Sequence, residues 1–220
     1  MKKILYTISI LALTLQGFSQ AQDKGAISID LGADLGAHFN QYDSKYNGAT
    51  IGDTDSSGAA TTMFRFDAHY NIVKLVSVGL HYRGGKYLED ENDLEIVNNK
   101  VNMIGLGVRL YPVNKDKFVW YLGATLGSSK LEINRQIVIL VTIPYQAKYK
   151  SSHVGFETGF SWYFAKNFGL NMGLGYSGQK FLMTDYSINN DPLDLTNWEN
   201  ILTTAGVHLN MGLAVKFGGN

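Results

Sequence analysis

The chain has 220 residues, with 19 basic and 19 acidic side chains and no cysteine. The missing cysteines exclude disulfides, thiolate metal sites and a lipid-carrying N-terminal cysteine. The balanced charge provides no basic field to recruit nucleic acid, so no nucleic-acid partner is expected. Twenty-four glycines, three prolines and 12% aromatic residues are typical of many regular strands. No apolar run reaches 18 residues, so any passage through a membrane must use strands.

The N-terminus has the layout of a secretory signal peptide. Two lysines begin the chain, an apolar stretch covers 4–15, and small residues follow it. This stretch is too short for a transmembrane helix, although an N-terminal core helix is an alternative. We therefore expect residues 1–21 to be a signal peptide and 22–220 to be a single domain. Without the two lysines the mature chain has 17 basic and 19 acidic side chains, a formal charge of −2.

Apolar residues then alternate with polar residues or glycine along the whole mature chain. In the segment 26–40, Ile27, Leu31 and Phe39 share one face, and Asp30 and Asp34 share the other. The same pattern returns in seven more segments, near 60–72, 76–88, 104–111, 118–127, 153–164, 168–176 and 207–217. Helical periodicity is absent after the signal segment. The pattern predicts an all-β meander of eight strands.

The predicted connections alternate between short and long. Short ones lie near 73–75, 112–117 and 165–167, and long ones near 41–59, 89–99, 134–147 and 178–199. Short turns at one end and long loops at the other are typical of outer-membrane barrels. We therefore predict an all-β fold: an eight-stranded antiparallel up-and-down transmembrane β-barrel with short periplasmic turns and long extracellular loops. An even strand number places both termini in the periplasm.

Alternation alone fits both a membrane barrel and a soluble ligand-binding barrel with an apolar interior. Glycines favour the first, because they share the polar face, and an eight-stranded barrel leaves room for charged interior side chains only where neighbours are small. Aromatic residues near both ends of the apolar face match the two interfaces of a bilayer. The apolar face is therefore predicted to contact lipid and the polar face to line the lumen.

The C-terminus carries the most specific local motif. Asn210, Gly212, Val215 and Phe217 are similar to the C-terminal signal by which outer-membrane barrels engage their assembly machinery, although three further residues follow here. With its strand pattern, the chain resembles the OmpA/OmpX-like or "porin family" outer-membrane β-barrels of Gram-negative bacteria. The resemblance implies the cell outer membrane as location, and lipid, lipopolysaccharide and the barrel-assembly machinery as partners. It implies no single activity.

Charged residues on the polar face balance one another in sign. A lumen ion-pair network is expected from Asp30, Asp34, Arg65, Asp67, Arg83, Arg109, Glu157 and Lys216. Pairing is expected because unpaired charge in a tight interior is costly. Arg65, Arg83, Asp67 and Asp34 should share one layer. This layer would close the lumen, and a proton or ion path is the alternative.

Catalytic and metal-binding motifs are weak. All five histidines fall on the polar face, and no strand offers a lipid-facing Ser/His pair, so no enzyme is predicted. The histidines lack ligand spacing, so interior hydrogen bonding is favoured over a metal site with Asp67. Residues 53–58 begin like a calcium loop, but Phe64 occupies its twelfth position. No cofactor or metal is expected.

Two of the long connections have unusual compositions. An acidic cluster of Glu89, Asp90, Glu91, Asp93 and Glu95 fits a solvated loop or cation-mediated bridges to lipopolysaccharide phosphates. An apolar segment contains Ile137, Ile139, Leu140, Val141 and Ile143. It fits either a protruding hairpin packed on its neighbours or a binding surface for a protein partner.

The overall prediction is an outer-membrane barrel with a polar, largely closed lumen and a structural or interaction role through its extracellular loops. A narrow channel for small solutes or protons, and a secreted soluble ligand-binding barrel, are the alternatives.

Overall fold

The computed structural model describes residues 22–89, 95–96, 98–138 and 142–218. Within them, eight long strands form the molecule: β1 (Ile27–Tyr46), β3 (Asp55–Val73), β4 (Val76–Glu89), β6 (Lys100–Asn114), β7 (Phe118–Val138), β8 (Thr142–Tyr163), β9 (Phe168–Ile188) and β11 (Trp198–Phe217). Three short strands lie beside them: β2 (Ala49–Thr50), β5 (Glu95–Ile96) and β10 (Asp191–Pro192). The predicted signal peptide, 1–21, lies outside the described residues.

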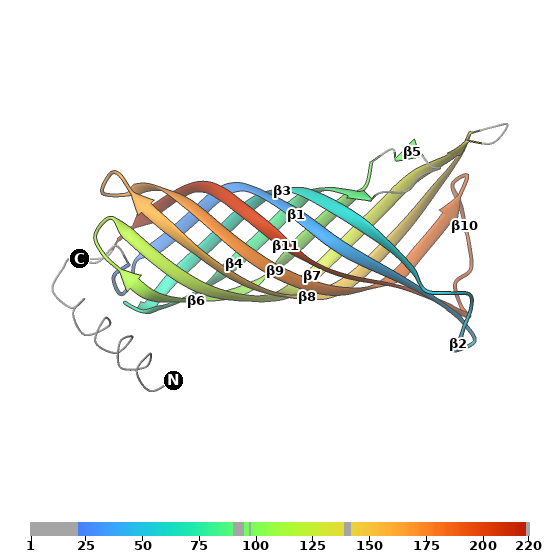
Figure 1. Ribbon diagram of the computed structural model, residues 1–220, viewed down its shortest axis with the longest axis horizontal. Coiled ribbons are helices and arrows are strands. Elements are labelled where there is room, and N and C mark those ends of the chain that lie inside the picture. Colours follow the sequence, from blue (N-terminus) through green and yellow to red (C-terminus); the bar gives the residue numbers. More distant parts are fainter. Residues whose placement is uncertain (1–21, 90–94, 97, 139–141, 219–220) are drawn as a thin grey trace.

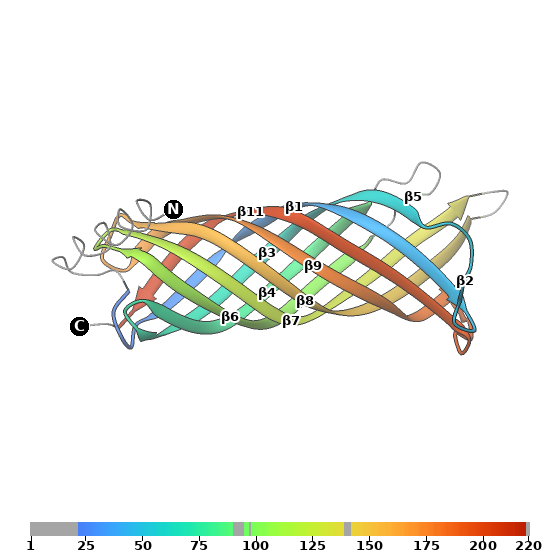
Figure 2. The same ribbon diagram turned by 60° about the horizontal axis from the view of Figure 1, so that its bottom comes forward.

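The long strands close into a barrel in which each pairs antiparallel with its neighbours in the chain. Closure joins β11 to β1, in a ladder that runs from Ile27 opposite Phe217 to Tyr46 opposite Trp198. Figures 1 and 2 show the strands wrapping obliquely around one long axis. The predicted eight-stranded up-and-down barrel is therefore confirmed. Over the described residues, no helix is both long and apolar enough to cross a membrane.

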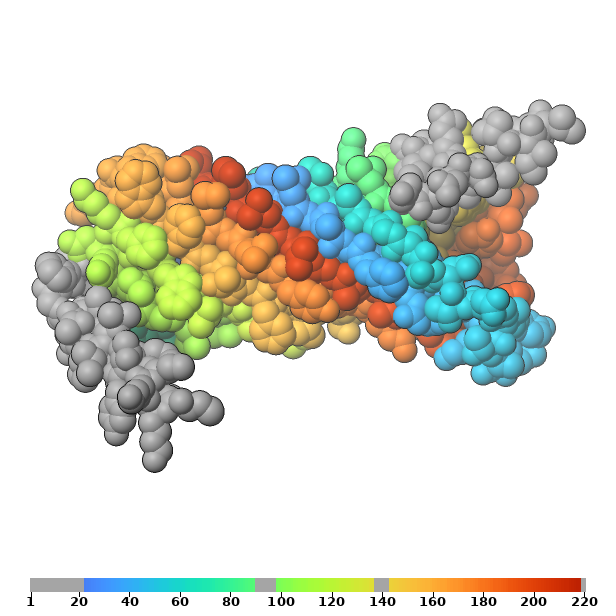
Figure 3. All heavy atoms as spheres, in the orientation of Figure 1, coloured from blue at the N-terminus to red at the C-terminus, as the bar shows by residue number. Residues whose placement is uncertain are grey.

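A continuous apolar band covers the outer wall. Leu106 is 66% exposed and Phe156 is 62% exposed, whereas the inward Arg65 is 1% exposed. Figure 3 shows β11, β1 and β3 side by side on one face of this wall. Exposed aromatic residues lie along the band at the short-turn end: Tyr70, Trp162, Phe164, Phe168 and Phe217. This arrangement is the inverse of a soluble barrel and confirms the predicted direction of the two faces.

Several glycines make room for interior side chains. A Cβ added to Gly79 would lie 2.8 Å from the His69 ring, and one added to Gly123 would lie 2.8 Å from Glu157 Cγ. Gly32 has a different role, because it faces Gly212 across the β1–β11 ladder and a Cβ there would overlap the backbone carbonyl of Met211. Glycine therefore permits both the filled lumen and the tight closure of the barrel.

The connections at the two ends of the barrel differ in length as predicted, but several strands are longer than the sequence pattern predicts. Short turns join β3 to β4, β6 to β7, and β8 to β9, whereas β1, β3, β7, β8 and β9 extend well into the segments expected to be long loops. We refer to the two ends as the short-turn end and the long-loop end. In Figure 1 the hairpin of β7 and β8 protrudes at the long-loop end. Its pairing continues to Val138 opposite Thr142.

Beyond the apolar band the strands keep their alternation of side chains, but the two faces exchange character: apolar residues point inward and polar residues point outward. Near the long-loop end, Leu131, Tyr149 and Phe181 point inward and are buried, while Lys130 and Lys150 point outward and are exposed. The inward apolar residues form a core: Met63, Tyr87, Val101, Met103, Leu131, Ile133, Ala147, Tyr149, Phe181 and Leu202. This part of the barrel has the polarity of a soluble protein, with polar side chains on its outer wall and apolar side chains inside.

Candidate functional site

A layer of buried ion pairs crosses the middle of the lumen. Asp67 of β3 is its centre, with contacts of 2.5 Å to Arg65 Nη2, 2.5 Å to Arg83 Nη1 and 3.0 Å to Arg109 Nη2. These three guanidinium groups come from β3, β4 and β6, so one carboxylate joins three strands. Every side chain in these pairs is buried. The geometry holds these strands at fixed separations inside the barrel.

Glu157 completes the layer from the opposite wall, since β8 carries it across from β3 and β4. Its carboxylate lies 3.1 Å from Arg65 Nη2 and 3.1 Å from Arg109 Nη2. Arg109 also reaches Asp30 at 2.6 Å, and its guanidinium carbon lies 4.2 Å above the Tyr121 ring. Arg109 therefore connects the ion pairs to an aromatic cluster near the short-turn end: Tyr111, Val119, Tyr121, Tyr163 and Ala214.

The structure brings together seven of the eight residues expected in the lumen network. Asp34 joins through Arg83, at 3.5 Å from its Nε atom. Lys216 lies elsewhere: its Nζ is 4.9 Å from the centre of the Tyr163 ring, towards the short-turn end. Lys216 was expected in the network because it shares the inward face of β11. Its position one residue before the end of β11 places it between the charged layer and the short-turn end.

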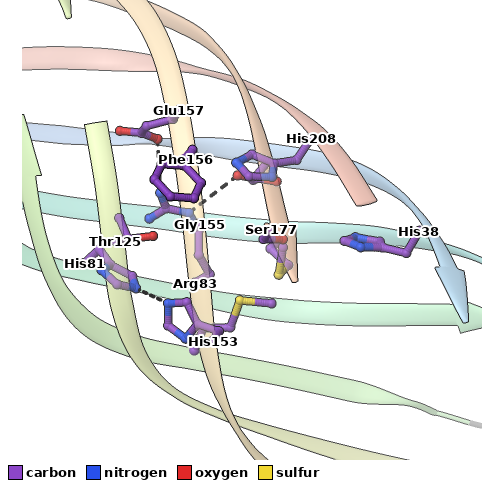
Figure 4. A pocket seen from close by; sticks show the side chains of 13 residues that line it. His38, His81, Arg83, Thr125, His153, Gly155, Phe156, Glu157, Ser177 and His208 are labelled. Carbon is purple, nitrogen blue, oxygen red and sulfur yellow. Dashed lines mark hydrogen bonds and ion pairs between the residues drawn. The ribbon is translucent and has the colours of Figure 1, made fainter. Parts of the chain in front are cut away.

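Four of the five histidines line one cavity beside the ion pairs: His38, His81, His153 and His208. His81 and His153 form a hydrogen bond of 2.7 Å between their Nε2 atoms, drawn as a dashed line in Figure 4. The cavity that the four histidines line has a volume of about 30 Å³, and Met63 and Met103 line it too. This volume holds about one water molecule. Across the described residues, no group of three potential ligands is placed to hold a metal ion.

Sequence analysis missed a second buried carboxylate network, around Glu89. Its carboxylate accepts hydrogen bonds from Asn40 at 2.7 Å, Tyr42 at 2.7 Å and Ser57 at 2.6 Å, and lies 2.6 Å from Arg135 Nη2. The expectation of a solvated Glu89 is therefore wrong, because Glu89 ends β4 on its inward face.

Burial next to this carboxylate raises the pKa of Tyr42 above its ordinary value, so its hydroxyl remains a donor. The other members of the predicted acidic cluster do not test whether the cluster is solvated or bridges to lipopolysaccharide. Asp90, Glu91 and Asp93 lie outside the described residues, and of Glu95 only the backbone is described.

A larger cavity opens at the long-loop end. It has a volume of about 530 Å³ and lies among β1, β8, β9, β11 and residues 193–195. Tyr42, Tyr149, Tyr186 and Trp198 give it aromatic walls, and Asp43, Ser44 and Asn200 supply polar groups. No single sequence motif marks it, because its lining comes from four strands and one loop.

The remaining predicted site residues are placed as follows. Ile137 is the register partner of Ile143, so β7 and β8 continue as a paired hairpin into the apolar segment. This continuation is what the protruding-hairpin alternative expects. Residues 139–141, which include Ile139, Leu140 and Val141, lie outside the described residues. The predicted assembly signal forms the last part of β11: Asn210, Gly212, Val215 and Phe217.

Solved structures of two outer-membrane proteins share this fold. The chain matches the outer membrane protein OprG from Pseudomonas aeruginosa with a TM-score of 0.63 and 17% identity, covering 91% of this chain and 100% of that chain. It matches the outer membrane protein AlkL, studied in DMPC lipid bilayers, with a TM-score of 0.56 and 12% identity, covering 91% of this chain and 94% of that chain. No protein-family model matches the sequence, and no curated protein does. At these identities the likeness establishes the fold alone.

Proposed function

We propose that this protein is an integral protein of the bacterial outer membrane, with a closed lumen and an interaction role at its long-loop end. The apolar outer band and the two outer-membrane structures that share the fold support this location. Both termini then lie in the periplasm with the short turns, and the β7–β8 hairpin projects from the cell.

The ion-pair layer carries the proposal of a closed lumen. Three arginines and four carboxylates form one connected set of ion pairs across the lumen, and each of these side chains is buried. The adjoining cavity of about 30 Å³ does not form a continuous path. Ions would have to displace strong pairs held in a low-dielectric interior, which disfavours the alternative of a narrow channel.

Planar-bilayer recording tests this proposal. The purified full chain should show no steady conductance above the bilayer background at neutral pH. A large, steady conductance of single molecules would contradict a closed lumen. Heat-modifiable gel mobility of the same sample should confirm that the recorded protein is folded.

We further propose that the protein is not an enzyme. The described residues do include a Ser/His contact, 3.3 Å between Ser77 Oγ and His69 Nδ1. However, Ser77 is fully buried and also bonds to Tyr111 at 2.8 Å, so a substrate carbonyl has no approach to it. A hydrolytic activity lost in a Ser77→Ala variant that still folds would contradict this proposal.

The cavity of about 530 Å³ favours a second function, the binding of a small amphipathic molecule from outside the cell. Its volume and its combination of aromatic walls with few polar groups are typical of small-molecule sites. Saturation-transfer NMR with indole as the probe, on the protein in nanodiscs, should show binding. Ile201→Trp would fill the cavity and abolish the signal, whereas Leu170→Trp on the outer wall should leave it unchanged. Equal signals from both variants would contradict the site.

Two partner proposals complete this function. The apolar segment 136–144, which connects β7 to β8 in the sequence, would contact a protein partner, and the end of β11 would engage the assembly machinery. Deleting 136–144 should leave the barrel assembled but remove a protein that co-purifies with the full chain from detergent-solubilised outer membranes. If the same proteins co-purify with both chains, the hairpin is a structural extension only.

A further inference from the structure

Five lysines form a belt around part of the outer wall, above the apolar band. They are Lys86 of β4, Lys100 of β6, Lys130 of β7, Lys150 of β8 and Lys180 of β9. All five side chains are exposed. We call them the lysine belt.

Each member of the lysine belt stands four residues beyond an outward apolar residue, although on β4 and β9 another exposed leucine, Leu88 or Leu182, lies two residues beyond the lysine. On β7, the outward residues run from Leu126 through Ser128 to Lys130, and on β8 they run from Val154 through Ser152 to Lys150. The other three strands repeat this order of apolar residue, small or polar residue and lysine: Tyr82–Gly84–Lys86, Ile104–Asn102–Lys100 and Tyr176–Gly178–Lys180.

This spacing defines a height. Four residues of a strand cover about 13 Å, which a tilt of about 40° reduces to about 10 Å along the barrel axis. Taking these apolar residues as the edge of the hydrocarbon, the Cα atoms of the belt stand about 10 Å beyond it, at the level of lipid head groups. Long lysine side chains reach such groups while their stems stay on the wall.

The belt covers one side of the barrel. The corresponding outward positions on the other three strands, four residues beyond Val207, Phe39 and Phe64, are Thr203, Asp43 and Ala60. A general need for lysine at a membrane interface would not select five adjacent strands. The partial belt instead indicates a localised anionic partner.

The lysines also oppose one another directly. Lys86 is the register partner of Lys100, and Lys130 is the register partner of Lys150. Like charges in such positions destabilise a sheet unless an anion lies between them. Among the described residues, lysine ion pairs within 4.0 Å of a carboxylate involve Lys45 and Lys74, and no member of the belt.

Acidic residues of the same wall neutralise only part of this charge. Glu132 lies across from Lys100 and from Lys148, and Asp185 also lies across from Lys148. Among the described residues of this side, the belt and Lys148 provide six cationic groups against these two carboxylates. The described part of the wall therefore has an excess of positive charge.

We propose that the lysine belt binds the phosphate groups of glycolipids in the outer leaflet of the outer membrane. In each opposed lysine pair, both ammonium groups can donate to one phosphate placed between them. The apolar band below the belt would contact the acyl chains of the same lipid. The protein would then hold an ordered shell of phosphorylated glycolipid on one side of its wall.

Lipid retention tests this proposal. The full chain is placed in phosphatidylcholine nanodiscs that contain diphosphoryl lipid A, extracted with mild detergent, and analysed for bound lipid by mass spectrometry. Wild-type protein should retain the diphosphoryl lipid and should not retain its dephosphorylated form. Retention should fall as salt is raised, because exposed charges are screened.

A matched pair of variants locates the site. Lys86→Gln, Lys100→Gln, Lys130→Gln and Lys150→Gln together should retain about tenfold less lipid A than wild type. The control replaces four lysines of the short-turn end with Gln, Lys74, Lys115, Lys117 and Lys166, which changes the net charge equally and should leave retention within about twofold. Equal loss in both variants, or retained binding in the belt variant, would overturn the proposal.

Thermal stability supplies a second readout. In phosphatidylcholine alone, the belt variant should unfold at the same temperature as wild type or higher, because the like-charge contacts are gone. Added lipid A should raise the unfolding temperature of wild type but not of the belt variant. If the fourfold variant does not fold, Lys86→Gln with Lys100→Gln, and Lys130→Gln with Lys150→Gln, are measured as separate variants, and unchanged lipid retention in both would overturn the proposal.

Discussion

Replacing Arg65 with Met should strongly destabilise the barrel. Arg65 is 1% exposed and lies 2.5 Å from Asp67 and 3.1 Å from Glu157. Met keeps much of the side-chain volume but removes the charge, so the layer changes from three arginines and four carboxylates to two and four. Removing one partner of a buried pair costs about 3–5 kcal/mol. We expect the free energy of unfolding to fall by that amount.

A double-mutant cycle separates lost charge from lost packing. Glu157→Gln in the Arg65→Met background restores the original charge difference, and Arg109 keeps Asp30 and Asp67 as partners. The double variant should therefore be more stable than additivity predicts, by about 0.5–3 kcal/mol. Urea unfolding in lipid vesicles, followed by tryptophan fluorescence, gives these free energies.

Lys45→Met serves as the control for removing a cation. Lys45 lies 3.7 Å from Glu199 in a partly exposed pair, which is worth about 0–1 kcal/mol. If Arg65→Met costs no more than this control, or if the two lumen substitutions are additive, the ion-pair layer does not hold the barrel together as argued.

Three further predictions concern other parts of the barrel. Gly32→Ala should lower the free energy of unfolding by about 1–3 kcal/mol, because its Cβ would overlap the Met211 carbonyl, whereas Gly58→Ala, which meets open space, should be tolerated in the same urea assay. Glu89→Gln should cost about 3 kcal/mol by removing the carboxylate beside the buried Arg135, and an unchanged urea midpoint would contradict this. Phe217→Ala should slow assembly into the outer membrane in pulse-chase experiments, whereas Phe164→Ala, an equally exposed aromatic at the same end, should not.

The membrane-facing half of the fold was predictable because one physical rule operates there. Hydrocarbon requires apolar side chains outside and paired backbone throughout, so period-two alternation identifies the strands and the direction of their faces. The lumen network follows the same parity: Arg65 and Glu157 lie 3.1 Å apart although 92 residues separate them in sequence. Lys216 shows the limit of this reasoning, since parity gives the face but not the height.

The long-loop end was predicted less well because the rule reverses there. Leu131 and Phe181 continue the alternation of their strands, but with apolar residues inward, so the end of the outward apolar run was interpreted as the end of the strand. Glu89 was assigned to a loop for the same reason. The cavity lined by Tyr42 and Trp198 requires four strands and a loop to be placed in space, which local sequence does not specify.

Buried side chains fill the lumen of this barrel over part of its length, and a cavity remains at the long-loop end. The cavity of about 530 Å³ opens at the long-loop end, and the ion-pair layer lies deeper in the lumen. Under the proposed function, a ligand of this cavity would exchange with the external medium, so its occupancy would follow the external concentration and would require no gradient or energy source. With the closed lumen proposed above, no solute would pass through the barrel to its short-turn end.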